Sequence, residues 1–209
     1  MIVGPSSKKS LRTQMIRDEI LRTALHLYTE NGYFNTSVHD IQRVAGVSIG
    51  SIYNHFGSKE AIAKSLYVAL LADMEALVDG IMTIHRGAHD RCRAVVLALF
   101  RQTEEDPEAT RFILSSRHRE FLPEEPSICS AEPFVKLRAI VQEGMEKGEL
   151  RQMEPWVASA TVFGPAIRLI HLRLDGLVPE PLPAFAEDLW QHTWRGVGLK
   201  PAPAPDAAD

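Results

Sequence analysis

The sequence has few cysteines and no long uninterrupted apolar run, and each shortage excludes a class of protein. Its two cysteines, Cys92 and Cys129, are too few for a disulfide framework, so we expect free thiols in a reducing cytoplasm. The first ten residues hold no apolar stretch of the kind found in secretory signals. The most apolar run, 156–174, is interrupted by Gly164 and Pro165 and contains two arginines and a histidine. We therefore expect a cytoplasmic protein with no membrane partner.

Motifs of the common enzyme classes are also missing. The chain has no glycine-rich phosphate loop and no nucleophile elbow, and its acidic clusters lie in stretches typical of solvated loops. We therefore expect no enzymatic activity and no cofactor. An enzyme on a helical scaffold is the remote alternative, and turnover that survives removal of residues 1–60 would support it.

What the sequence does have is helical periodicity. Apolar residues recur at spacings of three and four along most of the chain, which predicts an all-α fold. The first helix should end at Asn31 and Gly32. Eight more helices are expected, at 38–45, 48–56, 58–84, 89–104, 107–118, 131–147, 155–175 and 183–196.

The stretch "VHDIQRVAGVSIGSIYNHFGSKEAI", residues 38–62, combines two short helices with a tight connection. Gly46 suits the positive φ of the turn, and Ser48 can cap the helix that follows. Gly57 can stop that helix in a left-handed conformation. This order predicts a helix-turn-helix, in which the second short helix can enter the major groove of DNA.

The outward face of this second helix carries groups suited to reading DNA. Asn54 can bond adenine through two hydrogen bonds, and Ile49 can pack on a thymine methyl group. Gly50 has no side chain to hold the backbone away from phosphates. The predicted surface comprises Ile49, Gly50, Tyr53 and Asn54, with Ser48, Ser51 and His55 flanking them. The alternative is a solvent-facing helix in an ordinary bundle.

Charge is distributed unevenly, although the formal net charge is only −4. Residues 1–60 carry seven Lys or Arg against five Asp or Glu, whereas residues 61–209 carry sixteen against twenty-two. A polyanionic partner would therefore bind at the amino end.

The stretch "GYFNTSVHDIQRVAGVSIGSIYNHFGSKEAI" strongly resembles the DNA-binding region of TetR-type transcriptional regulators, over about residues 14–66. The resemblance implies a homodimer that binds double-stranded operator DNA through a three-helix amino-terminal domain. It also implies a larger helical domain for ligand binding and dimerisation. Ile49 departs from the family pattern, in which this position is often basic.

The same resemblance assigns roles to individual residues. Ile49, Ser51 and Asn54 would lie closest to the bases. Phosphate contacts would come mainly from Thr36, Ser37, Ser48, Tyr53, His55 and Lys59. A basic arm containing Lys8, Lys9 and Arg12 would add minor-groove or phosphate contacts, or else serve as a solubilising tail.

We accordingly expect four regions along the chain. They are a flexible basic arm at 1–12, the helix-turn-helix DNA-binding domain at 13–60, the helical ligand-binding and dimerisation domain at 61–198, and a disordered tail at 199–209.

The larger domain is expected to hold a small hydrophobic effector. Aromatic and aliphatic side chains at helical spacing would line the cavity, and Arg168 or His171 would anchor a polar group. The predicted pocket comprises Phe100, Phe112, Phe134, Trp156, Phe163, Ile167, Arg168 and His171. The alternative is that these residues simply pack as core. Pro165 should kink the helix beside the pocket, and Trp190 and Trp194 are expected at a dimer interface.

The stretch "HRGAHDRC" has spacings that could suit a metal site. His85, His89 and Cys92 are spaced so that they would converge on a continuous helix, but Gly87 weakens that helix and no fourth ligand is near. We therefore predict no metal, with exposed histidines and a packed Cys92.

The sequence thus predicts a repressor that a small hydrophobic effector releases from DNA. A DNA-binding regulator without an effector, which acts by recruiting partners, is the alternative.

Overall fold

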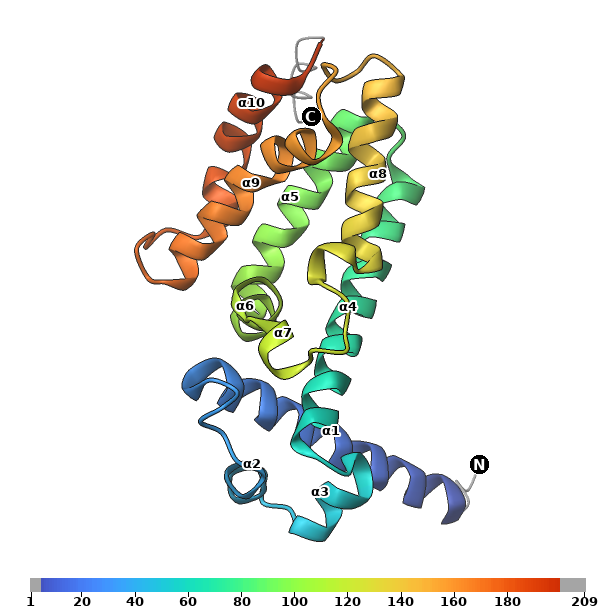
Figure 1. The fold of residues 1–209 in the computed structure, drawn as a ribbon, viewed down its shortest axis with the longest axis vertical. Coiled ribbons are helices and arrows are strands. Elements are labelled where there is room, and N and C mark those ends of the chain that lie inside the picture. Colours follow the sequence, from blue (N-terminus) through green and yellow to red (C-terminus); the bar gives the residue numbers. More distant parts are fainter. Residues whose placement is uncertain (1–4, 200–209) are drawn as a thin grey trace, which may run out of the picture. The chain divides into compact units, whose positions relative to one another are not determined.

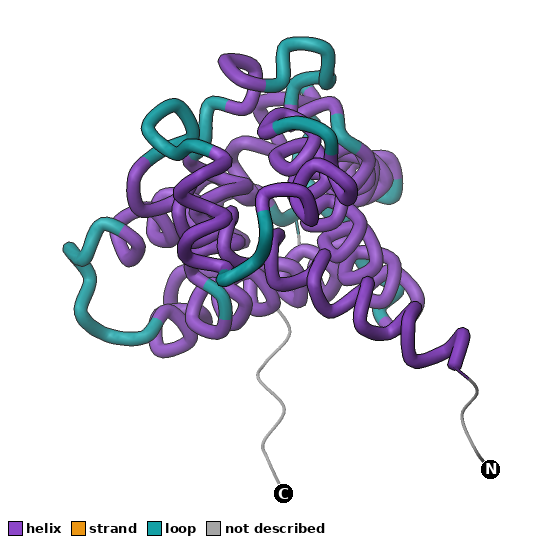
Figure 2. The backbone as a smooth tube through the Cα atoms, turned by 90° about the horizontal axis from the view of Figure 1, so that it is seen from below, coloured by secondary structure: helices purple, strands orange, loops and turns teal. Residues whose placement is uncertain are grey.

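The computed structural model describes residues 5–199, with side chains from Ser10 onward. Within this range the chain consists of helices and loops without a strand (Figure 2), which confirms the predicted all-α class. One isolated bridge pairs Leu150 with Gly198. In chain order (Figure 1), the elements are α1 (Pro5–Asn31), α2 (Val38–Ala45), α3 (Ile49–Phe56), α4 (Lys59–Ile84), α5 (Ala88–Glu105), α6 (Pro107–Ser115), α7 (His118–Phe121), η1 (Ile128–Ser130), α8 (Glu132–Glu146), α9 (Pro155–Leu174), η2 (Leu182–Phe185) and α10 (Ala186–Val197).

Two predicted helices differ from the observed ones. The helix expected at 107–118 stops at Ser115 and a short helix starts again at His118. The helix expected at 183–196 begins as the 3-10 turn η2 and continues as α10. Pro181 precedes η2 and Pro183 lies in its first turn, where a missing N–H costs no hydrogen bond.

The predicted basic arm is helical where the structure describes it. Residues 1–4 lie outside the described residues, but α1 begins at Pro5, so 5–12 continue the first helix. Proline suits the first turn of a helix, and the residues that follow it include good helix formers and no further glycine or proline. The predicted tail lies outside the described residues except for Leu199.

The described chain divides into two compact units, and the division differs from the predicted boundary at residue 60. Unit 1 runs to Leu70 and includes Arg111–Pro126, while unit 2 comprises Leu71–Thr110 and the chain from Ser127 onward. The returning segment is bound to α4, because the Tyr67 hydroxyl donates to the Pro126 carbonyl and Lys64 pairs with Glu125 at 2.5 Å. A three-helix domain of about 60 residues buries little surface alone, and this segment enlarges its core.

The core of unit 1 joins aliphatic residues of the four amino-terminal helices to an aromatic cluster. Tyr28 of α1 stacks with Phe112 of α6, with centroids 6.4 Å apart. Phe121 of α7 stacks with Tyr33 at 4.3 Å. The largest fully buried aliphatic side chains are Ile20, Ile41, Ile52 and Ile62.

His118 is buried inside this cluster. Its ring lies 4.9 Å from Tyr67, 5.1 Å from Phe112 and 5.7 Å from Phe121, measured between centroids. Its Nε2 atom has no hydrogen-bond partner among the described residues. Burial lowers the pKa of His118, and a hydrogen bond with the Phe112 backbone opposes this only in part. The site therefore favours the neutral imidazole.

Unit 2 is built on α5, α8, α9 and α10, which pack against one another. Its fully buried side chains include Phe100, Ile140, Ile170, Leu182 and Trp190. Gly144 allows the closest approach, because a Cβ atom there would lie 2.3 Å from Leu150 and 2.5 Å from the Ala88 side chain. α8 can therefore meet the start of α5 only with glycine at this position.

Trp190 and Trp194 belong to this core, so their predicted place at a dimer interface is wrong. They are 2% and 3% exposed and stack on each other at 5.6 Å. The Trp190 indole donates to His89 Nε2 at 3.0 Å. Because indole nitrogen only donates, His89 carries its proton on Nδ1 and donates it to Asp90. The spacing of the tryptophans marks the buried stripe of α10.

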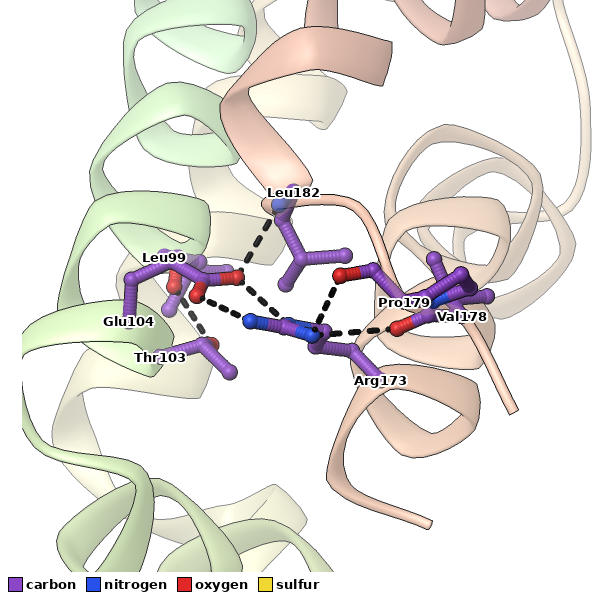
Figure 3. A network of polar contacts seen from close by, with 7 residues as sticks. All are labelled: Leu99, Thr103, Glu104, Arg173, Val178, Pro179 and Leu182. Carbon is purple, nitrogen blue, oxygen red and sulfur yellow. Dashed lines mark hydrogen bonds and ion pairs between the residues drawn. The ribbon is translucent and has the colours of Figure 1, made fainter. Parts of the chain in front are cut away.

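A polar clamp holds the end of α9 to α5 (Figure 3). The Arg173 guanidinium donates to both carboxylate oxygens of Glu104, at 2.9 and 2.8 Å. It also donates to the carbonyls of Val178 and Pro179, and Glu104 accepts the Leu182 N–H at 3.0 Å. One carboxylate thus fixes α9, the loop after it and the start of η2.

Replacing Glu104 should destabilise the protein. Glu104→Ala leaves the Leu182 N–H and the Arg173 guanidinium without their acceptor, which costs about 1–3 kcal/mol of unfolding free energy. Guanidinium unfolding followed by circular dichroism measures the effect. The neighbouring exposed Glu105→Ala is the matched control, and equal unfolding midpoints for the two variants would contradict the clamp.

The protein should become less stable as the pH is lowered, because of His118. The folded pKa lies below the unfolded value of about 6.5, so the stabilisation is complete above pH 6.5 and declines as pH falls. The slope contributed by one site is at most about 1.4 kcal/mol per pH unit. His118→Phe should flatten the decline between pH 6.5 and 5, measured by unfolding at several pH values. The exposed His39→Gln should retain it, and an unchanged slope in His118→Phe would refute the assignment.

Candidate nucleic-acid interface

The turn between α2 and α3 is fixed by caps at both ends. Ser37 starts α2 with a capping box, in which its hydroxyl accepts the Asp40 N–H and the Asp40 carboxylate accepts the Ser37 N–H. Gly46 ends α2 at φ 65°, a left-handed conformation that glycine adopts without strain. Ser48 caps α3 by accepting the Ser51 N–H at 3.1 Å. These contacts confirm the helix-turn-helix geometry.

The turn is also held from inside. Gln42 donates to the Val47 carbonyl at 3.0 Å, which ties α2 to the residue just before α3. Ile52 is 1% exposed and anchors α3 in the core of unit 1. Arg17 of α1 lies over the Phe56 ring, with 5.4 Å to the centroid. As a result, α3 is held in a fixed orientation, and the face that does not contact the core points outward.

That remaining face carries the residues expected to read DNA. Tyr53 is 52% exposed and Asn54 is exposed, and neither side chain has a hydrogen-bond partner among the described residues. Gly50 is exposed, and a Cβ atom there would touch only the Ser48 hydroxyl. Ile49 and His55 are half-buried beside them. Asn54 therefore keeps its full donor and acceptor capacity for a base edge.

Ser48 and Ser51 lie at the start of this face. Their hydroxyl oxygens are 2.9 Å apart, and one donates to the other. Because the pair shares a single bond, one of its two hydroxyl hydrogens is left to donate outward. The pair can thus reach one phosphate or base acceptor while it caps α3.

Thr36 and Ser37 differ from this, because their hydroxyl hydrogens are already donated within the protein. Thr36 is 2% exposed and its hydroxyl lies 3.1 Å from the Leu27 carbonyl and 3.0 Å from that of Gly32. Ser37 donates to Asp40 at 2.6 Å. Hydrogen bonds from Ser37, and then Arg43, lower the pKa of Asp40 to about 2, so it is an anion at neutral pH. The two residues position α2, and their predicted phosphate contacts require these bonds to be exchanged.

Lys59 is likewise tied to the loop before α2. Its ammonium donates to the carbonyls of Tyr33 and Thr36, at 3.1 and 3.0 Å. It also lies 4.1 Å from the centroid of the Tyr33 ring. An ammonium has three N–H donors, so one is left for a phosphate. Lys59 is placed to position the loop as well as to contact DNA.

The Tyr33 ring also contacts α7, and the sequence did not predict this contact. Phe121 stacks on Tyr33 at 4.3 Å, and the Lys59 ammonium lies 4.1 Å from the centroid of the same ring. The Tyr33 hydroxyl donates to Glu60 at 3.2 Å. Burial, then the Glu60 carboxylate, raises the pKa of Tyr33 to about 12, which keeps the phenol protonated as the donor. The only sequence signal was the aromatic content of 111–126.

A comparison with known families decides what this unit is. Residues 20–66 match the family described as bacterial regulatory proteins, tetR family. The amino-terminal unit is of the TetR type. The resemblance drawn from residues 14–66 is thereby confirmed, and the match ends within α4.

A named relative matches part of the chain. Over 58 residues this chain is 40% identical to the HTH-type transcriptional repressor KstR2 of Rhodococcus jostii. That alignment covers 28% of this chain and 28% of KstR2, so this chain spans less than a third of the relative that it matches.

Solved structures extend the likeness of fold to unit 2, which we call the body. A TetR family transcription regulator from Marinobacter aquaeolei superposes with a TM-score of 0.78 at 20% identity, over 90% of this chain and 98% of that one. FadR from Bacillus subtilis, solved in complex with stearoyl-CoA, gives a TM-score of 0.68 at 21% identity, over 84% and 96%. At these identities the comparison establishes the TetR-type fold alone.

The predicted ligand-pocket residues are spread over both units. Phe112 lies in unit 1, stacked on Tyr28, and so does not line the body. Trp156 is 57% exposed, with the Arg138 guanidinium 4.3 Å from its ring centroid. Arg168 is exposed as well. The remaining five lie within unit 2, where Phe100 and Phe163 are buried and Phe134, Ile167 and His171 are half-buried.

The histidine and cysteine triplet does not share one helix. α5 begins at Ala88 after Gly87, so His85 lies outside the helix that carries His89 and Cys92. Both ring nitrogens of His89 are engaged, and burial raises the pKa of the Cys92 thiol. No group of three or more potential metal ligands occurs in the part of the chain that the structure describes. Within the same part, no helix is long and apolar enough to cross a bilayer.

The interface predicts different effects for a base-reading and a positioning residue. Asn54→Ala should cost about 1–3 kcal/mol on a selected duplex and little on random DNA, because only a base edge can use its amide. Lys59→Met should weaken binding to both, because it frees the loop before α2 and removes a cation. Fluorescence anisotropy with both duplexes measures these losses. An equal loss on both for Asn54→Ala would remove Asn54 from base reading.

Proposed function

We propose that this protein is a sequence-specific DNA-binding transcriptional regulator that represses its target and is released by a small hydrophobic effector. The observation that carries the proposal is the outward face of α3, where Tyr53 and Asn54 stand exposed on a helix fixed by caps and core. Such a helix fits the major groove and reads base edges there. Operator DNA is accordingly the first partner.

The repressor part of the proposal is supported by the named relative. KstR2 of Rhodococcus jostii is a transcriptional repressor, and 58 residues of this chain, about the length of the DNA-binding unit, are 40% identical to it. Repression by steric occupation of DNA requires only that unit and tight binding. Regulation requires a second, ligand-sensitive state of the body.

An effector site in the body is supported by its apolar interior. Phe100 and Phe163 are buried, and Phe134 and Ile167 lie at the edge of the same helix group, α5, α8 and α9. Walls of this kind suit a hydrophobic compound with few polar groups. FadR of Bacillus subtilis, a protein of the same fold, is in complex with stearoyl-CoA. We infer a long apolar effector of comparable character.

A homodimer is supported by the outer face of α9. Trp156 is 57% exposed and Val157 is 54% exposed, and small residues continue the same face at Ala160 and Gly164. Apolar groups of this size rarely remain together in water on a monomer. A symmetric pairing of α9 would cover them and bring two copies of α3 to one duplex.

A bulky side chain in the apolar interior of the body should block release by the effector and leave the affinity for DNA unchanged. Ile167→Trp adds bulk at the edge of the apolar interior, so stearoyl-CoA should release DNA at least tenfold less effectively than from the unmodified protein. Release is measured as loss of anisotropy of a labelled duplex selected from a random library. Leu177→Trp, at a site 69% exposed, is the matched control.

Two outcomes would change the proposal. Equal release from both tryptophan variants would place the effector elsewhere. If no hydrophobic probe loosens DNA binding and the interior proves packed, the effector is refuted and the partner-recruiting regulator takes its place.

A further inference from the structure

Unit 1 contains a pocket of its own, separate from the interior of the body. Its volume is about 220 Å³, and every residue that lines it belongs to unit 1. They come from the end of α1 and the loop after it, and from α6, α7 and the residues that join these two helices. The lining residues that carry the argument are Tyr28, Tyr33, Phe34, Phe112, Arg117 and Glu120.

The walls of this pocket are aromatic and already arranged for stacking. Tyr28 and Phe112 are stacked with an interplanar angle of 23°, and Tyr33 and Phe121 with an angle of 17°. Phe34 is perpendicular to Tyr33 at 5.3 Å and remains 65% exposed, so most of this side chain is available to a further ring. Aromatic pairs add about 0.5–1.5 kcal/mol beyond the burial of area. A flat aromatic molecule is therefore the ligand shape that these walls favour.

The rim carries no net charge. Arg117 and Glu120 both line the pocket and form an ion pair with each other at 3.2 Å. Because each charge is already paired, a charged ligand finds no free counter-ion there, while either residue can bond a neutral polar group. A ligand without net charge and with one hydrogen-bonding edge fits this rim.

The volume limits the size of the ligand. Pockets for drug-sized molecules measure about 300–1,000 Å³, and this one is smaller. One or two fused rings therefore fill it. A long acyl chain, the kind of compound proposed for the body, exceeds it.

We propose that this pocket binds a small, uncharged aromatic compound of one or two rings, and that binding tunes the affinity for DNA. Tyr33 and Phe34 line the pocket and lie in the loop before α2, three to four residues ahead of its N-cap, Ser37. Lys59 holds the same loop through the carbonyls of Tyr33 and Thr36. A ring stacked against Phe34 therefore acts on the segment that orients the helix-turn-helix.

Binding is tested on the whole protein without DNA, so the result does not depend on the proposed regulatory function. Saturation-transfer NMR with 2-naphthol and indole should detect binding. Naphthalene-2-carboxylate, 2-naphthylmethylammonium and decahydro-2-naphthol, which are anionic, cationic and saturated, should bind at least tenfold more weakly. Failure of both 2-naphthol and indole to bind at millimolar concentration would overturn the proposal.

Variants locate the site. Phe34→Ala should weaken 2-naphthol binding at least tenfold, and Phe34→Tyr should restore it, since the ring face returns. Val44→Ala, an exposed apolar residue of unit 1 outside the pocket, is the matched control and should change nothing. Circular dichroism checks that each variant is folded.

The body variant separates this site from the effector site. Ile167→Trp should bind 2-naphthol as the unmodified protein does. If Ile167→Trp abolishes binding and Phe34→Ala does not, the compound occupies the body and the pocket in unit 1 is refuted. With 2-naphthol bound, the affinity for a selected duplex should shift at least threefold in the unmodified protein and remain constant in Phe34→Ala. An unchanged affinity would refute the tuning.

Discussion

Two helices of eight residues each cannot hold themselves in place, and the organisation of unit 1 follows from this constraint. Isolated helices shorter than about 12–15 residues are marginal in water, and α2 and α3 fall well below that length. Their order is therefore supplied from outside, by caps at Ser37 and Ser48 and by burial of Ile41 and Ile52. What is left over, the outward face of α3, is the part that can meet DNA.

The same constraint explains why Lys59 is engaged twice. The loop between α1 and α2 has no regular structure, so its carbonyls need donors, and the ammonium provides them for Tyr33 and Thr36. Lys59 is expected to bind phosphate, and it also holds the loop between α1 and α2 in place. Loss of DNA binding after its replacement would combine two causes, and only a comparison with Asn54 separates reading from positioning.

Local signals made the DNA-binding unit predictable from the sequence. Gly46, Ser48 and Gly57 each have a conformational role that depends on neighbours a few residues away, and the helices they delimit are observed where expected. The internal donation by Thr36 and Ser37 was not predictable, because serine and threonine hydroxyls suit a phosphate and a carbonyl equally well.

The body was less predictable, because its features depend on contacts between distant segments. Trp190 and Trp194 have the spacing of one helix face, but the sequence does not say whether that face meets another helix or a second chain. His89, from a helix about a hundred residues earlier, decides it. The sequence likewise predicts Phe112 in the pocket of the body, and this prediction is wrong. Nothing in its helix shows that the segment 111–126 belongs with the amino-terminal unit.

The return of 111–126 to unit 1 limits how this protein can be recombined with others. A graft of residues 13–60 onto a foreign body would bring the reading helix but leave behind Phe112 and Phe121, which cover Tyr28 and Tyr33. The graft would then present uncovered aromatic rings to water and invite aggregation. A functional chimaera must carry both segments, so the smallest transplantable part of this protein is discontinuous along the chain.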